Sequence, residues 1–282
     1  MVLRTQGNWL FQRNRLSPRR SLHYFETMRI GFVGTGTITR AIVTGLLHVE
    51  APFEHISLSP RNADVGATLA GLDRRISVCG TNQEVLDSSD IVCLAVVPQI
   101  AAEVLEALNF EGRHHVISFI AGVSISDLEQ RVGKARASIR AVPLPAVAAA
   151  KGSTAICPPD EVTRRLFSYV GTPVEVTDEN KFDALSAVTA TMASFYAVLE
   201  TQAAWLVAQG IDYNSARAYL AAYSVGLAHQ TSLSDKPFSA LVQDSMTPGG
   251  INEQLHRELS GKGTYAHYSE ALDNVLRRIE GR

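Results

Sequence analysis

Short apolar runs of strand length alternate with amphipathic segments in the first two thirds of the chain. Between the runs, apolar residues recur every three or four positions, a spacing typical of helices that bury one face. Strands that alternate with helices in this way form a parallel sheet covered by helices. The expected strands are residues 30–33, 56–58, 91–97, 116–120, 137–141, 154–157 and 173–176, and the expected helices are 38–46, 64–70, 100–108 and 160–169.

The character of the chain changes after residue 178. The strands stop, the sequence Thr177-Asp-Glu-Asn signals a helix start, and apolar helices are expected at 182–209, 215–230 and 265–279. The first of these helices is apolar on nearly every face, so it must be surrounded. Its polar residues, which include Asp183, Glu200 and Gln202, argue against a membrane span. We infer a helical core shared by two copies of the chain, the alternative being a small self-contained bundle.

A glycine turn joins the first expected strand to the first expected helix. Gly34 permits a tight turn, and Gly36 lets the backbone approach a pyrophosphate. The amides of Thr37 and Ile38, at the positive end of the helix, would face that pyrophosphate. Thr39 occupies the third glycine position of the dinucleotide signature. Because a strand and a helix flank the turn as the signature requires, we expect a dinucleotide here rather than a plain strand-to-helix connection.

The end of the second expected strand discriminates between the two nicotinamide dinucleotides. An acidic residue at this point would hold the ribose hydroxyls of NAD, and none is present. Instead Ser59, Arg61 and Asn62 offer a hydroxyl, a guanidinium and an amide where a 2′-phosphate would lie. We therefore expect NADP as the cofactor. The alternative is that Arg61 is a solvated residue of the first helical turn.

Composition and charge narrow the class of protein. The 282 residues are 46% hydrophobic and 19% charged, which suits a two-domain globular enzyme, and the net charge of −2 gives no electrostatic basis for binding nucleic acid or an acidic membrane. The three cysteines have no paired spacing, and Cys93 lies inside an apolar run, so a reducing cytoplasm is expected. With no His-Glu-x-x-His motif and no Cys/His cluster, no metal site is expected.

Residues 1–27 are basic, with five arginines against a single acid, Glu26. This composition is compatible with a transit peptide, but the segment lacks the continuous apolar core of a secretory signal. Because the first strand starts directly after Met28, we expect a disordered extension or an upstream start codon rather than a targeting segment.

Six short motifs occur along the chain in a specific order and spacing. They are Gly31-Phe-Val-Gly-Thr-Gly36, Ser59-Pro-Arg-Asn62, Ala95-Val-Val-Pro-Gln99, Ser118-Phe-Ile-Ala-Gly-Val123, Arg140 with Pro143, and Thr247-Pro-Gly-Gly250. Together they resemble the pyrroline-5-carboxylate reductase family. The resemblance implies an α/β Rossmann domain at 28–178, followed by an all-helical dimerisation domain at 179–282. It also implies reduction of a cyclic imine by NADPH, most directly pyrroline-5-carboxylate to proline, in an active site completed at the interface of a homodimer.

The same matching adds further expected cofactor contacts. Asn82 looks like a nucleotide contact, as does the turn that contains Ala95, Val96 and Pro98. The loop that contains Ala121 and Gly122 looks like the nicotinamide side of the site.

The expected substrate site follows Pro248. Amides at Gly249, Gly250 and Ile251, where the turn enters a helix, are expected to hold a substrate carboxylate without a basic side chain. Thr247 adds a hydroxyl donor. Asn252 replaces a threonine typical of the family, and its amide can donate to the imine nitrogen or the carboxylate. The alternative for the turn is a helix-to-helix connection. Thr191 and Ser194 complete the expected catalytic group.

Departures from the family pattern leave other functions open. Leu144 and the segment Thr189-Ala-Thr-Met-Ala-Ser194 differ from the usual residues, and Val97 replaces a lysine. The fold could therefore serve another imine, a β-hydroxyacid, a deazaflavin-dependent reduction of NADP, or NADPH binding without turnover. A β-hydroxyacid dehydrogenase needs an acid such as lysine on the interdomain helix, where Lys181 is poorly placed.

Overall fold

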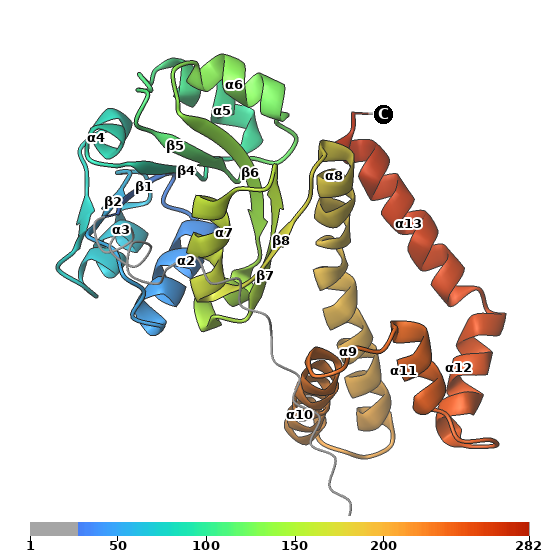
Figure 1. Ribbon diagram of the computed structural model, residues 1–282. Coiled ribbons are helices and arrows are strands. Elements are labelled where there is room, and N and C mark those ends of the chain that lie inside the picture. Colours follow the sequence, from blue (N-terminus) through green and yellow to red (C-terminus); the bar gives the residue numbers. More distant parts are fainter. Residues whose placement is uncertain (1–27, 282) are drawn as a thin grey trace, which may run out of the picture. The chain divides into compact units, whose positions relative to one another are not determined.

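The computed structural model describes residues 28–281, and the chain divides into two compact units, the first ending at Glu179 and the second beginning at Asn180 (Figure 1). The expectation of a disordered extension or an upstream start codon falls on residues 1–27, which lie outside the described part. The first unit contains the sheet with its covering helices, and the second is entirely helical in its described residues.

The first unit is built on an eight-stranded sheet in the order β3-β2-β1-β4-β5-β6-β7-β8. Neighbouring strands are parallel except for the antiparallel pair β6 and β7. Because β1 lies between β2 and β4, the direction of winding reverses at β1, and the carboxyl ends of these strands form a crevice there. The strands are β1 (Arg29–Val33), β2 (His55–Leu58), β3 (Ile76–Val78), β4 (Ile91–Leu94), β5 (His115–Ser118), β6 (Ala137–Pro143), β7 (Gly152–Cys157) and β8 (Gly171–Glu175).

Helices cover both faces of this sheet (Figure 1). Successive residues of β4 point to opposite faces, so Ile91 and Cys93 join one apolar cluster while Val92 and Leu94 join another. All four are fully buried, which explains why β4 is continuously apolar. The covering elements are α2 (Thr37–His48), α3 (Ala63–Ala70), α4 (Asn82–Asp87), α5 (Pro98–Glu106), α6 (Ile125–Val132), the 3-10 helix η1 (Pro145–Ala149) and α7 (Glu161–Val170).

The expected strands of the first unit are all present, although some end earlier than the apolar runs suggested. The run at 91–97 stops being a strand after Leu94, and the run at 116–120 stops after Ser118. Four short elements, β3, α4, α6 and η1, were not expected. Two of them have clear N-caps, because the hydroxyl of Thr81 accepts the amide of Glu84, and that of Ser124 accepts the amide of Asp127.

The second unit contains six helices in its described residues, and the first two of them stand where a single helix was expected. The helix expected at 182–209 is two helices, because the chain tightens at Thr189 and Ala190, whose amides bond to the carbonyls of Ser186 and Ala187. The helices are α8 (Glu179–Val188), α9 (Thr191–Ala208), α10 (Tyr213–Ser232), α11 (Phe238–Asp244), α12 (Ile251–Gly261) and α13 (Thr264–Ile279).

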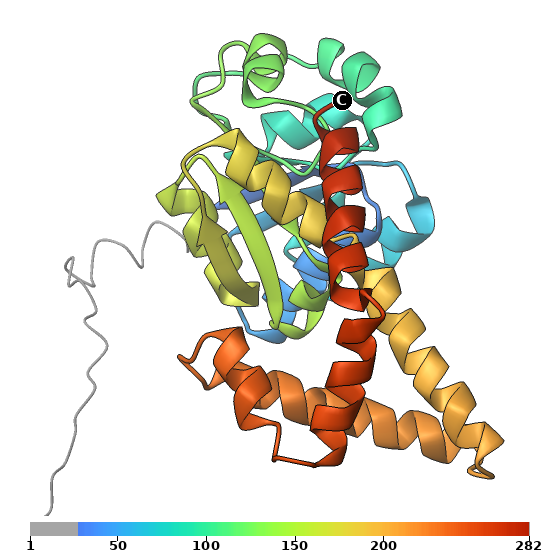
Figure 2. The same ribbon diagram turned by 90° about the vertical axis from the view of Figure 1, so that its right-hand side faces the viewer.

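This helical unit has little core of its own. Its buried cluster consists of Ala203, Ala216 and Leu220, from α9 and α10, with Leu199 and Leu206 packed against them. Helices α11, α12 and α13 contribute no buried residue within the described chain. Figure 2 shows α9 and α10 joined by a short turn, and α12 followed directly by α13. The helical stretch 179–208 is long and apolar enough to cross a membrane by length and composition alone, because an 18-residue window within it has a mean hydropathy of 1.4.

A buried polar contact links the start of β5 to the start of α7. The ring nitrogen Nε2 of His115 lies 2.9 Å from Oδ1 of Asp160, which also accepts the amide of Thr163 as the N-cap of α7. Burial raises the pKa of Asp160, but hydrogen bonds with His115 and Thr163 outweigh that effect and lower the pKa to about 2.

We predict that Asp160→Asn removes a pH-dependent part of the stability. An unfolded Asp titrates near 3.9, so the carboxylate of Asp160 stabilises the fold above about pH 4, and this contribution is lost as the pH falls towards 2. Asn keeps the N-cap, so the loss at pH 7 should be about 1–2 kcal/mol. Urea unfolding at pH 7, 5 and 3 measures it, with the exposed Asp64→Asn as control. An equal loss at all three pH values would contradict the prediction.

Candidate functional site

The glycine turn after β1 has the shape of a phosphate cradle. Gly34 has a φ of +107°, and a Cβ there would lie 2.5 Å from the carbonyl oxygen of Ala95, so only glycine fits. Gly36 precedes α2, and a Cβ on it would meet nothing within 4 Å, so its outer side is open. No side chain caps α2, which leaves its first amides, at Thr37 and Ile38, for an anion. These residues fit the pyrophosphate of a dinucleotide.

Thr39, in place of the third glycine, secures this turn from inside. Its side chain is fully buried, and its hydroxyl donates to the carbonyl oxygen of Gly34 at 2.6 Å. The signature therefore departs from three glycines without losing the turn.

Ser59 lies inside the glycine turn. Its side chain is 1% exposed, and its hydroxyl accepts the amide of Gly34 at 2.9 Å. The hydroxyl of Thr35 donates to the carbonyl of Ser59 at 2.7 Å, and the two hydroxyls lie 3.1 Å apart. The Ser59 hydroxyl therefore points into the turn rather than out of the strand end, where it supports the backbone of Gly34. Its contact with a 2′-phosphate stays a prediction.

Arg61 and Asn62, by contrast, face solvent at the end of β2. Both are exposed, and no hydrogen bond or ion pair within the described chain engages the Arg61 guanidinium. Asn62 adopts the left-handed conformation, with a φ of 68°, and precedes α3 without capping it through its side chain. Both side chains are therefore free to bind a ligand.

Other expected cofactor residues follow neighbouring strands at the same edge of the sheet. Val33 pairs with Leu94, and Leu94 pairs with Ser118, so the turns after β1, β4 and β5 lie side by side. Asn82 is the half-buried first residue of α4, which follows β3. The expected residues after β4 and β5 are Ala95, Val96 and Pro98, and Ala121 and Gly122.

The expected substrate turn is well formed, but part of it is already occupied. Gly249 has a φ of +72°, and the amide of Gly250 donates to the carbonyl of Thr247 at 2.8 Å. The amide of Gly249 donates to Oε2 of Glu253 at 2.6 Å. These two amides are therefore not free for a substrate carboxylate, contrary to expectation. The first amides of α12, beginning at Ile251, remain.

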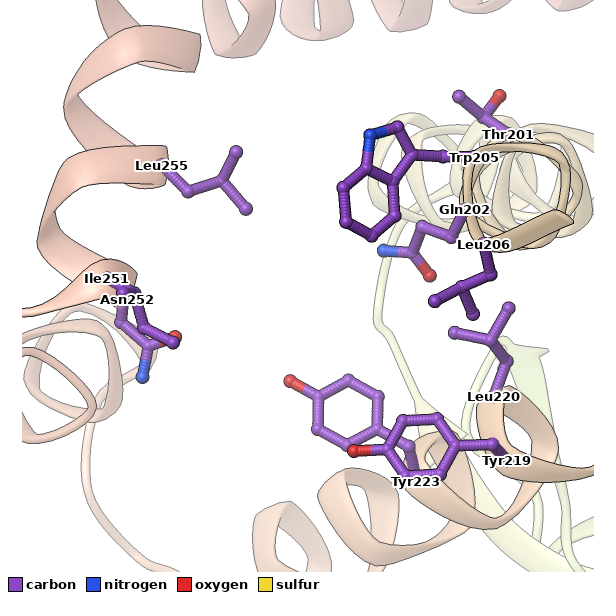
Figure 3. A pocket seen from close by; sticks show the side chains of 10 residues that line it. All are labelled: Thr201, Gln202, Trp205, Leu206, Tyr219, Leu220, Tyr223, Ile251, Asn252 and Leu255. Carbon is purple, nitrogen blue, oxygen red and sulfur yellow. The ribbon is translucent and has the colours of Figure 1, made fainter. Parts of the chain in front are cut away.

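Asn252 also has an internal partner. Its Nδ2 donates to the carbonyl of Ser245, the C-cap of α11, at 2.9 Å. The side chain nevertheless lines a cavity of about 680 Å³ between α12 on one side and α9 and α10 on the other (Figure 3). Trp205, Tyr219 and Tyr223 form its aromatic side, and Ile251 and Leu255 lie beside Asn252.

Thr191 and Ser194 line a different cavity. It is smaller, at about 120 Å³, and lies against α13 at Tyr268 and Leu272. The hydroxyl of Thr191 already donates to the carbonyl of Val188 at 2.8 Å. Along α9, Thr191 lies about 15 Å from Thr201 and about 22 Å from Leu206, two residues that line the cavity of Asn252, and Ser194 lies about 10 Å from Thr201. Within one helical unit, the expected catalytic group is therefore not brought together.

Titratable groups add little to the site. Glu200, the acid of α9, accepts a hydrogen bond from the hydroxyl of Tyr213 at 2.8 Å, and this bond raises the pKa of Tyr213. Within residues 28–281, no group of three or more His, Cys, Asp or Glu side chains could hold a metal ion.

We predict that Ser59→Ala weakens NADPH and NADH binding by the same factor. The variant leaves the amide of Gly34 without its partner, which disturbs the pyrophosphate turn that both cofactors would use. A factor of about 5 to 100 is expected. Titration of NADPH and NADH fluorescence measures it. Ser57→Ala, which removes a buried hydroxyl of β2 that pairs with Ser88, is the control. A loss of affinity confined to NADPH would contradict this prediction and show that Ser59 contacts the 2′-phosphate.

Two family models match the chain. Residues 29–122 match the model described as NADP oxidoreductase, coenzyme F420-dependent. Residues 179–281 match the model described as pyrroline-5-carboxylate reductase dimerisation. The first match covers the glycine turn and the strand ends beside it, and the second covers the helical unit.

Similarity to known proteins extends over nearly the whole chain. It is 31% identical over 271 residues to a pyrroline-5-carboxylate reductase of Synechocystis sp., covering 90% of this chain and 98% of that protein. One from Methanosarcina acetivorans is 30% identical over 270 residues, covering 90% and 97%. The Plasmodium falciparum pyrroline carboxylate reductase with NADP bound has the same fold, with a TM-score of 0.78 at 19% identity over 91% of this chain and 98% of that chain. The chain belongs to the pyrroline-5-carboxylate reductase family.

Proposed function

We propose that this protein reduces pyrroline-5-carboxylate to proline with NADPH, as an oxidoreductase acting on a CH–NH bond. The observation that carries the proposal is the open phosphate cradle at the switch point of the sheet, in a chain similar to pyrroline-5-carboxylate reductases along almost their whole length. We favour NADP over NAD because Arg61, exposed and unengaged within the described residues, ends β2 where NAD enzymes carry an acid.

The chemistry asks the protein mainly for positioning. NADPH, when bound, supplies a hydride to the carbon of the imine. An imine that is already protonated needs no strong base from the protein, which suits a site whose candidates are hydroxyls, an amide and backbone groups. The chain would hold the substrate carboxylate on the first amides of α12, with Thr247 as an additional donor.

The orientation of Asn252 refines its proposed role. Because Nδ2 is bonded to the carbonyl of Ser245, Oδ1 is the free end of the amide. We therefore propose that Oδ1 accepts the N–H of the protonated imine, rather than that Asn252 donates to it. The hydrogen bond from Nδ2 to the carbonyl of Ser245 fixes the orientation of the Asn252 amide.

We propose a homodimer as the functional unit. Trp205, Tyr219 and Ile251 are 63%, 69% and 84% exposed, on a helical unit whose cluster of buried residues is small. Apolar surface of this extent is stabilised by burial against another protein surface. The match to a dimerisation model over residues 179–281 favours a second copy as that partner. We further propose a cytoplasmic enzyme that binds neither nucleic acid nor membrane, in keeping with a net charge of −2.

A panel of cyclic imines tests the reaction. We expect NADPH oxidation with pyrroline-5-carboxylate to exceed that with five- and six-membered imines that lack a carboxylate, because the amides of α12 would bind that group. The measurement is the loss of NADPH absorbance, with proline identified as the product. Turnover of none of these imines would overturn the proposal, and preference for an unsubstituted imine would reassign the substrate.

We predict that Arg61→Ala weakens NADPH binding and leaves NADH binding unchanged. A charge-assisted hydrogen bond to a phosphate contributes roughly 1.5–3 kcal/mol, so the loss should be about ten- to a hundredfold. Dissociation constants for both cofactors measure it, with the exposed Arg74→Ala as control. Equal weakening of both cofactors would show that Arg61 does not contact the 2′-phosphate.

We predict that Asn252→Ala lowers kcat/KM by about ten- to a hundredfold, with the affinity for NADPH unchanged. The loss corresponds to roughly 1–3 kcal/mol for a ligand group left without its partner. Asn252→Thr, which restores the residue typical of the family, should keep or raise activity with pyrroline-5-carboxylate. Gln254→Ala, on the same helix, is the control. Unchanged kinetics in both variants would remove Asn252 from the site.

A further inference from the structure

A partly buried ion pair, between Arg140 and Glu179, lies at the cofactor edge of the sheet. The side chain of Arg140, on β6, is 6% exposed, and its Nη1 lies 2.6 Å from Oε1 of Glu179. The same oxygen accepts the amide of Ile125, the first residue of α6, at 2.9 Å. One carboxylate therefore joins the sheet to the start of α6.

The Glu179 carboxylate fixes one end of the loop 119–124. Arg140 pairs in register with Ser118, the last residue of β5. The loop 119–124 leaves β5 at that point and ends where Ile125 begins α6. The loop is thus fixed at one end by the β5–β6 pairing and at the other by the bond from Ile125 to Glu179. Between these ends, Ala121 and Gly122 are exposed, and Gly122 has a φ of +72°.

The order of the strands indicates which part of the cofactor this loop would face. A dinucleotide placed with its pyrophosphate on the β1 turn extends to both sides along the edge β2-β1-β4-β5. The adenosine half would lie towards Arg61, after β2, so the nicotinamide half would lie towards the loop after β5.

We propose that Arg140 and Glu179 are positioning residues that hold the loop 119–124 against the nicotinamide ring. The inference rests on the proposed function, because it assumes that NADPH binds along this edge. Glu179 is also the first residue of α8, and the division between the two units follows it directly.

Glu179→Ala in the full chain tests the proposal. We expect kcat with pyrroline-5-carboxylate to fall about ten- to a hundredfold, because a displaced nicotinamide no longer aligns with the imine. Adenosine 2′,5′-bisphosphate, which has no nicotinamide, should bind within twofold of wild type. Glu179→Gln keeps an acceptor for Ile125 and Arg140 and should recover part of kcat.

Asp90→Ala is the matched control. Asp90 forms an ion pair with Arg29 through two hydrogen bonds, of 2.8 and 3.0 Å, at the amino ends of β1 and β4. Its side chain is 39% exposed, and that of Glu179 is 33% exposed. Asp90→Ala should lower the melting temperature without a comparable loss of kcat. An unchanged kcat in Glu179→Ala, an equal loss of kcat in Asp90→Ala, or equal weakening of adenosine 2′,5′-bisphosphate would overturn the proposal. If Glu179→Ala does not fold, Glu179→Gln and Asp90→Asn are compared instead, and a smaller fall in kcat, confined to Glu179→Gln, is expected because Gln keeps the acceptor but not the charge.

Failure of this proposal is distinguishable from failure of the proposed function. If the wild-type protein reduces no imine, the proposed reaction is wrong, and the fluorescence of bound NADPH still reports the surroundings of the nicotinamide. Glu179→Ala should then change that emission while leaving the affinity for adenosine 2′,5′-bisphosphate unchanged. Identical emission from wild type and Glu179→Ala would overturn the positioning role by itself.

Discussion

The cofactor edge of the sheet depends on the close approach of Gly34 to the carbonyl oxygen of Ala95. A side chain at position 34 would lie 2.5 Å from that oxygen, so the turn after β1 can be made only by glycine. Two hydroxyls then hold the Gly34 backbone from both sides, because Thr39 donates to its carbonyl and Ser59 accepts its amide. The turn is therefore fixed by neighbouring elements, which leaves the first amides of α2 facing outward for a ligand.

The helical unit differs from the first unit because it has more apolar side chains than one copy of the chain can bury. The first unit buries its strands from both faces, whereas the helical unit buries a cluster drawn only from α9 and α10. Large side chains such as Phe195, Tyr219 and Phe238 remain at least half exposed. Stability of this unit is therefore coupled to association, and substitutions on these faces will act on assembly before they act on chemistry.

Local features of the sequence were good guides where a residue's role depends on its neighbours in the chain. The glycine turn and the apolar strands were predicted because glycine readily adopts a positive φ, and because runs of apolar residues indicate buried strands. The short elements β3, α4 and α6 were missed because three to eight residues carry little periodic signal. The bond between the Ser59 hydroxyl and the amide of Gly34 was not predicted, because the two residues are 25 positions apart in the chain. No spacing rule in one sequence indicates the direction of such a side chain.

The candidate catalytic residues line two separate cavities of the helical unit. Thr191 and Ser194 line one cavity of the helical unit, while Asn252 lines another beside later turns of the same long helix. Along α9, Thr191 and Ser194 lie about 15 Å and about 10 Å from Thr201, the first α9 residue of the cavity that Asn252 lines, and both separations exceed the size of a cyclic imine. If both sets act on one substrate, they must come from different copies of the chain. The exposed apolar faces of α9 and α10 then serve the chemistry as well as the stability, because burying them against a second copy is what would complete the site.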